Sequence, residues 1–105
     1  MKIFISQPMR GKTDAEILAE RERVIEAAKA KWGDDVEVLE SFFQGAPAKA
    51  KPMWFLGESL KVMADADAII LCKGWSEARG CKVEFYAADV YGIPDFSMVG
   101  DEIKY

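Results

Sequence analysis

The chain has 105 residues, half of them hydrophobic, with a net charge of −4 and a pI near 4.8. This length and hydrophobic content predict one domain over residues 1–105, with a core that needs no disulfide or metal. The net negative charge argues against a nucleic-acid partner, because proteins that bind nucleic acids usually have a basic face. The lack of a long apolar run argues against a membrane partner.

The residue types present restrict the chemistry further. The chain has no histidine and only two cysteines, Cys72 and Cys81. Histidine general bases, Ser–His nucleophile pairs and most zinc sites are therefore excluded, and we expect neither a metal nor a cofactor. The few cysteines, and an amino end that enters a strand directly, indicate a reduced, cytoplasmic setting.

The first predicted element is an apolar strand over residues 2–6, followed by a loop over residues 7–13 with proline, arginine and glycine. Loops between a strand and a helix are where many nucleotide-binding α/β domains bind anions. Arg10 and Lys12 add positive charge there, which favours phosphate. Alternatively, Arg10 pairs with an acidic neighbour such as Asp14 and never meets a ligand.

A helix is expected next, because Thr13 to Glu16 have the spacing of a capping box and Gly33 is a stop signal. Its apolar residues recur at helical spacing and predict a buried face: Ile17, Leu18, Val24, Ile25, Ala28 and Trp32. Its charged residues predict a solvated face with salt bridges: Glu20, Arg21, Glu22, Arg23 and Glu26.

The middle of the chain is less regular. Residues 36–39 predict a short strand, and residues 40–51 fit no period and predict a mobile loop. In that loop Phe42 and Phe43 belong either to a lid or interface, or to the edge of the core. Pro52 suits the first turn of a second helix. Four residues at helical spacing in that helix predict core: Met53, Leu56, Leu60 and Met63.

The last third predicts a buried central strand over residues 68–71, a polar loop over 73–80 and a third helix over about 81–91. Residues 92–94 end this helix, and residues 96–99 form a short strand. The tail, residues 101–105, either adds an edge strand or docks on a neighbouring molecule. We see no repeat and no linker.

Alternation of strands and helices predicts a parallel sheet with right-handed crossovers. The expected fold is a three-layer α/β domain, flavodoxin-like (Rossmann-like), with a parallel sheet of four or five strands. In that layout the first and third strands are neighbours, and the ligand crevice opens between their carboxyl ends. Residues 6–12 and 73–84 would form this crevice.

Glu84, expected in the first turn of the third helix, is the residue we single out at this crevice. A carboxylate near the anomeric carbon of a sugar can attack it and form a glycosyl-enzyme ester. Gly80 would let a ligand approach the backbone closely. The alternative role of Glu84 is to complement the helix dipole, and spacing alone favours that alternative.

A set of motifs along nearly the whole chain adds weight to the catalytic interpretation. They are residues 2–11 (KIFISQPMRG), residues 66–70 (ADAII), Gly74-Trp75, residues 80–84 (GCKVE), Ala87-Ala88 and residues 91–94 (YGIP). In order and spacing the chain resembles the nucleoside 2-deoxyribosyltransferase-like superfamily. The closest resemblance is to its small, phage-enriched branch of uncharacterised domains and to the deoxynucleotide N-hydrolases.

This resemblance implies that Glu84 is the nucleophile. It also implies that the first strand–helix loop binds the phosphate of a deoxynucleotide, which assigns substrate binding to Ser6, Met9, Arg10 and Gly11, with Arg10 as the main cation. Asp67 matches an aspartate that precedes the third strand in the family. We therefore assign it a catalytic role, although its simplest role is structural.

This chain also departs from the family pattern at two positions. The family usually has Tyr in the first strand, where this chain has Phe4, and an Asp on the second helix, where it has Ser59. Ser59, at the position of that Asp, is assigned to substrate binding, as are Trp75 and Gly80, the latter because it would let a ligand approach the backbone. Trp75 has two possible roles: it stacks on the base, or it is a hydrophobic plug over the end of the sheet.

The predicted function is cleavage or transfer at the N-glycosidic bond of a (deoxy)nucleoside or nucleoside monophosphate. The alternative is a non-catalytic nucleotide-binding or protein-interaction module on the same fold, which the departures at Phe4 and Ser59 favour. Family members commonly pair so that a neighbour completes the site, which implies a homo-oligomer, expected to be a dimer.

Overall fold

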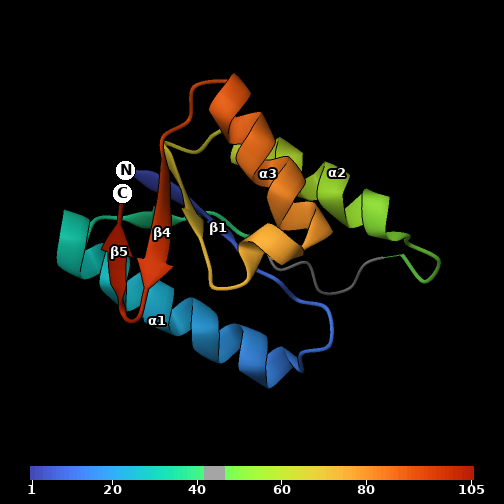
Figure 1. Cartoon of the computed structure of the whole chain (residues 1–105), viewed down its shortest axis with the longest axis horizontal. Helices are drawn as coiled ribbons and strands as arrows, with labels where there is room; N and C mark the ends of the chain where they lie inside the picture. Colours follow the sequence, from blue (N-terminus) through green and yellow to red (C-terminus); the bar gives the residue numbers. More distant parts are fainter. Residues whose placement is uncertain (42–46) are drawn as a thin grey trace.

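The structure is a computed structural model that describes residues 1–41 and 47–105 (Figure 1). Within these ranges the elements follow the predicted order. They are β1 (Lys2–Ser6), α1 (Asp14–Trp32), β2 (Glu37–Val38), α2 (Pro52–Met63), β3 (Ala68–Leu71), the 3₁₀ helix η1 (Trp75–Glu77), α3 (Arg79–Val90), β4 (Asp95–Val99) and β5 (Glu102–Lys104). The predictions for Phe42 and Phe43 lie outside the described residues.

The strands form one sheet in the order β2-β1-β3-β4-β5. The pairs β1–β2, β1–β3 and β3–β4 are parallel, so β1 and β3 are neighbours as predicted. The fifth strand differs from the prediction of a purely parallel sheet, because β5 runs antiparallel to β4. Only Gly100 and Asp101 separate the two strands, and a connection this short permits a hairpin but no crossover. The layout is compatible with a flavodoxin-like fold.

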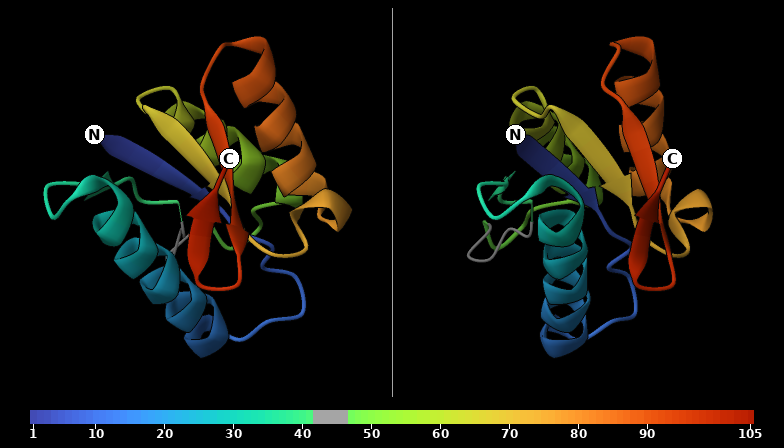
Figure 2. Two further views of the ribbon diagram at one scale, coloured as in Figure 1. Left: turned by 60° about the vertical axis from the view of Figure 1, so that its left-hand side comes forward. Right: turned by 90° about the vertical axis from the view of Figure 1, so that its left-hand side faces the viewer.

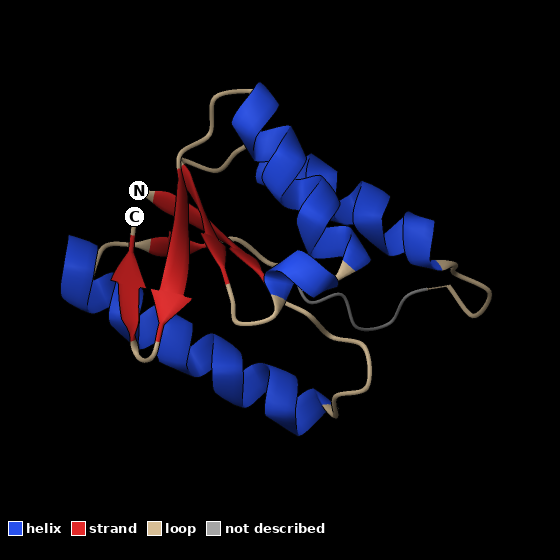
Figure 3. Cartoon of the chain, viewed as in Figure 1, coloured by secondary structure: helices blue, strands red, loops and turns tan. Residues whose placement is uncertain are grey.

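The helices cover both faces of the sheet (Figures 2 and 3). Helix α1 lies on one face, and α2 and α3 lie together on the other. From β1 to β2 the chain moves one way along the sheet, and from β2 through β3 to β4 it moves the other way. Right-handed connections therefore place α1 opposite α2 and α3. The reversal lies between β1 and β3, which is where ligand sites form in such sheets.

Each face has its own apolar core. On the α1 face the core is built around Ile3, Ile5, Val24, Ala28, Ala68 and Ile70. On the α2–α3 face it is built around Phe4, Met63, Ile69, Leu71 and Ala88. Alternate residues of β1 and β3 thus point to opposite faces, as the strand period requires. Burial on both faces explains why residues 68–71 form a continuous apolar run.

Helix α1 begins with the predicted capping box. Thr13 Oγ1 accepts from the Glu16 backbone N–H at 3.2 Å, and Glu16 Oε1 accepts from the Thr13 N–H at 2.9 Å. Two predictions for this helix were wrong. Leu18, expected in the core, is half exposed, and Arg21, expected in solvent, is buried. Arg21 Nη1 donates to Ser41 Oγ at 2.9 Å, which attaches α1 to the segment that follows β2.

Helix α2 begins at Pro52 as predicted, and Met63 at its end is buried. Leu56 and Leu60 are partly buried, but the core assignment of Met53 was wrong because its side chain is 79% exposed. Figure 1 shows the reason: the first turn of α2 extends beyond the strands, so a residue on its inward stripe has no sheet to cover.

Candidate functional site

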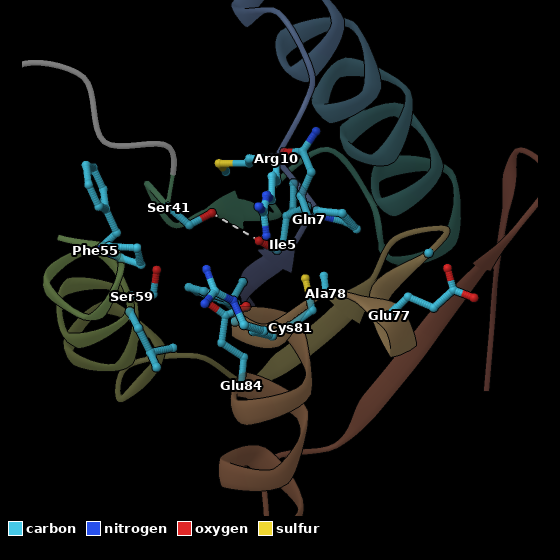
Figure 4. A pocket seen from close by; sticks show the side chains of 18 of the residues that line it. Ile5, Gln7, Arg10, Ser41, Phe55, Ser59, Glu77, Ala78, Cys81 and Glu84 are labelled. Atoms are coloured by element: carbon cyan, nitrogen blue, oxygen red, sulfur yellow. Dashed lines mark hydrogen bonds between the residues drawn. The ribbon is translucent and has the colours of Figure 1, made fainter.

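A cavity of about 960 Å³ opens at the carboxyl ends of β1 and β3. Its wall includes residues 7–10, which follow β1, and residues 77–81, which lead into α3, together with parts of α2. The two loops predicted to face each other therefore do so. Figure 4 shows Arg10 and Gln7 on the β1 side of the cavity, Cys81 and Glu84 on the α3 side, and Phe55 and Ser59 along α2. The volume suits a small-molecule ligand.

Glu84 lies at this cavity and is buried, with 8% of its surface exposed. The Ser6 hydroxyl donates to Glu84 Oε1 at 2.6 Å, so the end of β1 holds the carboxyl group of α3. Burial raises the pKa of Glu84, and the hydroxyls of Ser6 and Ser59 partly oppose that rise. Because α3 begins at Arg79, two residues earlier than predicted, Glu84 lies in its second turn. Its buried bond to Ser6 is not that of a surface residue that only complements a helix dipole.

Ser59 reaches the same place from α2. It is buried and lines the cavity, and its hydroxyl acts on the pKa of Glu84. Three elements that are distant in the sequence thus bring Ser6, Ser59 and Glu84 together. Hydroxyls around a buried carboxyl group restrict its orientation, which is what an attacking oxygen needs.

The loop after β1 provides part of the predicted phosphate site. Met9 and Arg10 line the cavity, and Arg10 is exposed and forms no ion pair within residues 1–41 and 47–105, with Asp14 or otherwise. Gly11 does not line the cavity; its φ of +78° marks a turn that favours glycine. Lys12, the second expected cation, pairs with Glu20 at 3.6 Å and stays outside the lining.

Gln7 is a site residue that the sequence analysis missed. Its Nε2 donates to the Ile17 carbonyl at 2.8 Å and to Glu20 Oε1 at 2.9 Å, which attaches the loop to α1. These two acceptors determine the orientation of the amide. Its Oε1 is then buried without a hydrogen-bond partner among the described residues, an arrangement that costs about 1–3 kcal/mol.

The amino end of α3 also opens into the cavity. Ala78, Arg79, Gly80 and Cys81 line the wall, and the N-cap residue Ala78 provides no side-chain hydrogen bond to this helix. Arg79 is exposed and is a second lining cation that the sequence analysis did not assign. A Cβ added at Gly80 would meet no protein atom within 4 Å, so the surrounding protein does not require glycine at this position. The predicted role of Gly80, close approach of a ligand, stays a prediction.

Asp67 and Trp75 are not brought to the cavity. Asp67 precedes β3, so it lies at the amino edge of the parallel sheet, where its Oδ2 accepts from the Lys2 N–H at 2.7 Å. This position and this bond support the structural role that was its simplest interpretation, and the catalytic role stays a prediction that the cavity does not support. Trp75 packs on Phe85 with ring centroids 4.9 Å apart and joins the core of the α2–α3 face. This is the hydrophobic plug of the two predicted roles.

An apolar wall on α2 was not predicted as part of the site. Pro52, Phe55 and Leu56 line the cavity next to Ala50. Leu56 had been assigned to the core by its spacing. Two aromatic residues are among the described lining: Phe4, which is buried in the core of the α2–α3 face, and Phe55, of which 37% of the surface is exposed.

The thiols are poor candidates for the reacting group. Burial raises the pKa of Cys81 to about 11 and that of Cys72 to about 12. Thiols with such pKa values hold almost no thiolate near neutral pH. Across residues 1–41 and 47–105, no three His, Cys, Asp or Glu side chains gather closely enough to bind a metal ion. No helix in the same ranges has the length and apolar content to span a membrane.

Comparisons with known proteins do not assign this site, since no family model, no curated protein and no solved structure matched the chain.

Proposed function

We propose that this chain is a flavodoxin-like domain that cleaves or transfers at the N-glycosidic bond of a nucleoside monophosphate or deoxynucleoside. One observation carries the proposal: a buried glutamate, Glu84, held by the Ser6 hydroxyl at 2.6 Å on the wall of a cavity with room for a nucleotide. The resemblance of the sequence to the nucleoside 2-deoxyribosyltransferase-like superfamily supports the same residue and the same chemistry.

In the proposed mechanism a Glu84 carboxylate oxygen attacks the anomeric carbon through an oxocarbenium-like transition state. The new C–O bond forms as the C–N bond breaks, and the base leaves with the bonding electron pair and takes up a proton. Water, or a second base in a transferase, then attacks the same carbon and releases the glutamate. Ser6 binds Oε1 and so aligns the carboxylate for attack.

Arg10 is proposed to hold the phosphate. Its side chain lines the cavity, has no ion-pair partner in the described part of the chain, and comes from the loop between β1 and α1. A guanidinium binds phosphate with charge-assisted hydrogen bonds. Arg79, at the amino end of α3, adds a second positive charge to the same cavity.

A non-catalytic nucleotide-binding module is the second candidate. The arrangement of the acidic side chains that line the cavity favours it. A leaving base gains from a proton donor, which in many glycosidases is a second carboxyl group. Ser59 stands where the related family has an aspartate. The other acidic residue of the described lining is Glu77, and Figure 4 shows its side chain pointing away from Glu84.

Incubation with a panel of nucleosides and nucleoside monophosphates, in ribose and deoxyribose forms, separates the two candidates. We expect free base to appear with at least one monophosphate, and to be absent with Glu84→Gln, which keeps the side-chain shape but is a poor nucleophile. Nucleotide binding without base release by the unmodified protein would favour the binding module. The predicted homodimer stays a prediction, and the same samples can be sized by light scattering.

A further inference from the structure

The apolar wall of the cavity lies on the first turns of α2. Pro52, Phe55 and Leu56 contribute to it, and Phe55 is partly exposed. The neighbouring Trp54 ring stands nearly perpendicular to the Phe55 ring, at 85° with centroids 5.0 Å apart. In such an edge-to-face pair Trp54 covers at most one face of Phe55, and 37% of the Phe55 surface stays exposed.

The position of Phe55 relative to the reacting group is determined by the helix. Phe55 and Ser59 are four residues apart, so they lie on the same side of α2, about 6 Å apart along its axis. The Ser59 hydroxyl acts on Glu84. Figure 4 shows Ser59 between Phe55 and Glu84, and Arg10 on the opposite side of the cavity. One helical turn of α2 thus separates Phe55 from Ser59, and Glu84 lies beyond Ser59 on α3.

A nucleotide has the same arrangement of parts. The anomeric carbon carries the base on one side and, through the sugar, the phosphate on the other. With that carbon at Glu84 and the phosphate at Arg10, the base extends along α2 towards Phe55. Two other aromatic residues are poorer candidates. Phe4 lines the cavity but is buried in the core, with 1% of its surface exposed. Trp75 is packed on Phe85 and is not part of the lining.

We propose that Phe55 is the stacking surface for the base, and that the apolar wall of α2 is the base subsite. This inference rests on the proposed function. Stacking uses the face of the base, so the loss on removing Phe55 should grow with ring area and be larger for a purine than for a pyrimidine.

Equilibrium binding tests the proposal in the Glu84→Gln background, which prevents turnover during the titration. The probes are adenosine monophosphate and ribose 5-phosphate, which lacks the base, together with their 2′-deoxy counterparts. Phe55→Ala should weaken nucleotide binding by roughly fivefold to a hundredfold. Sugar-phosphate binding should not change, and Phe55→Tyr should restore nucleotide binding. Tyr86→Ala, which removes an exposed aromatic ring on α3 outside the cavity, is the matched control.

The outcomes distinguish the subsite from the proposed function. Equal weakening of nucleotide and sugar phosphate, or no weakening of either, would overturn the base subsite while leaving nucleotide binding intact. Binding of none of the probes would overturn the proposed function, and the base subsite with it. Loss confined to the ligands that carry a base supports the base subsite and the nucleotide binding that the proposed function requires.

Discussion

A carboxyl side chain lies at each of the two edges of the sheet. Both accept a hydrogen bond, but they differ in burial. At the amino edge Asp67 is exposed and accepts a hydrogen bond from the Lys2 backbone, its neighbour across the β1–β3 pair. At the carboxyl edge Glu84 is buried, and its pKa is raised by burial. Sequence reasoning assigned a catalytic role to both residues, but only one of them reaches the cavity.

The two edges differ in whether they bury polar groups at a cost in free energy. The amino edge places its carboxylate in water beside a donor. The carboxyl edge contains a desolvated carboxyl group at Glu84 and a buried carbonyl at Gln7 without a partner in the described residues. Perturbed groups gathered in one cleft indicate a functional site more often than a structural one. This contrast supports the proposal that the carboxyl edge carries the chemistry and that Asp67 at the amino edge contributes to stability.

The largest expected effect concerns base release. Glu84→Gln should lower its rate about a thousandfold or more, because the attacking oxygen is lost. Asp67→Asn should leave the rate unchanged, because Asp67 is at the far edge of the sheet. Initial rates of free-base formation from the best monophosphate measure both. A comparable loss in Asp67→Asn, in a protein with an unchanged circular dichroism spectrum, would remove the distinction between the edges.

The next effect concerns phosphate recognition at the carboxyl edge. Charge-assisted hydrogen bonds are worth about 1.5–3 kcal/mol, so Arg10→Ala should weaken monophosphate binding about tenfold to a hundredfold. Binding of the matching nucleoside should hardly change. Arg23→Ala, an exposed arginine on α1 outside the cavity, is the control. Equal losses for nucleoside and monophosphate would show that Arg10 supports the loop instead of binding phosphate.

A third effect concerns stability against pH. Because burial raises the pKa of Glu84 above its ordinary 4.5, the folded protein binds this proton more tightly than the unfolded chain. The contribution of Glu84 to the free energy of unfolding is therefore fully present below about pH 4.5, and it is lost as pH rises through the raised pKa. Glu84→Gln cannot ionise, so it should melt at a higher temperature than the unmodified protein at alkaline pH. This advantage should shrink as pH falls towards 4.

Thermal unfolding of the two proteins, followed across this pH range, measures the difference. An equal difference at every pH would mean that packing, and not ionisation, separates the variants. A Gln variant that is less stable at alkaline pH would contradict a desolvated carboxyl group.

The smallest effect belongs to the amino edge. Asp67→Ala removes one hydrogen bond that lies in solvent, so the free energy of unfolding should fall by only about 0.5–1 kcal/mol. Urea denaturation measures this change. A much larger loss would mean that Asp67 has a structural role beyond its bond to Lys2.

The fold was predictable because its signals are local. The capping box at Thr13, the stop at Gly33 and the apolar run at residues 68–71 depend on neighbours in sequence, and all three appear as expected. The errors concern environment. Arg21 is buried because Ser41, twenty residues away, accepts its hydrogen bond, and no helical pattern contains that information.

The candidate site was predictable only in part, for the same reason. Glu84 and Arg10 were found from their place after a strand and from the resemblance. Phe55 was missed because nothing in its local pattern says that the start of α2 borders the cavity. Gln7 was missed because the orientation of its amide depends on Ile17 and Glu20, which bind the amide nitrogen and leave the carbonyl without a partner among the described residues.

Direct detection of the glycosyl ester tests the central claim most closely. A reaction with the best monophosphate is stopped in acid within its first turnovers. The protein is then digested, and the mass of the peptide that contains Glu84 is measured by mass spectrometry. The account predicts a mass increase equal to one sugar phosphate on Glu84, absent from Glu84→Gln. Base release at the same rate by Glu84→Gln, or an adduct on any residue other than Glu84, would contradict it.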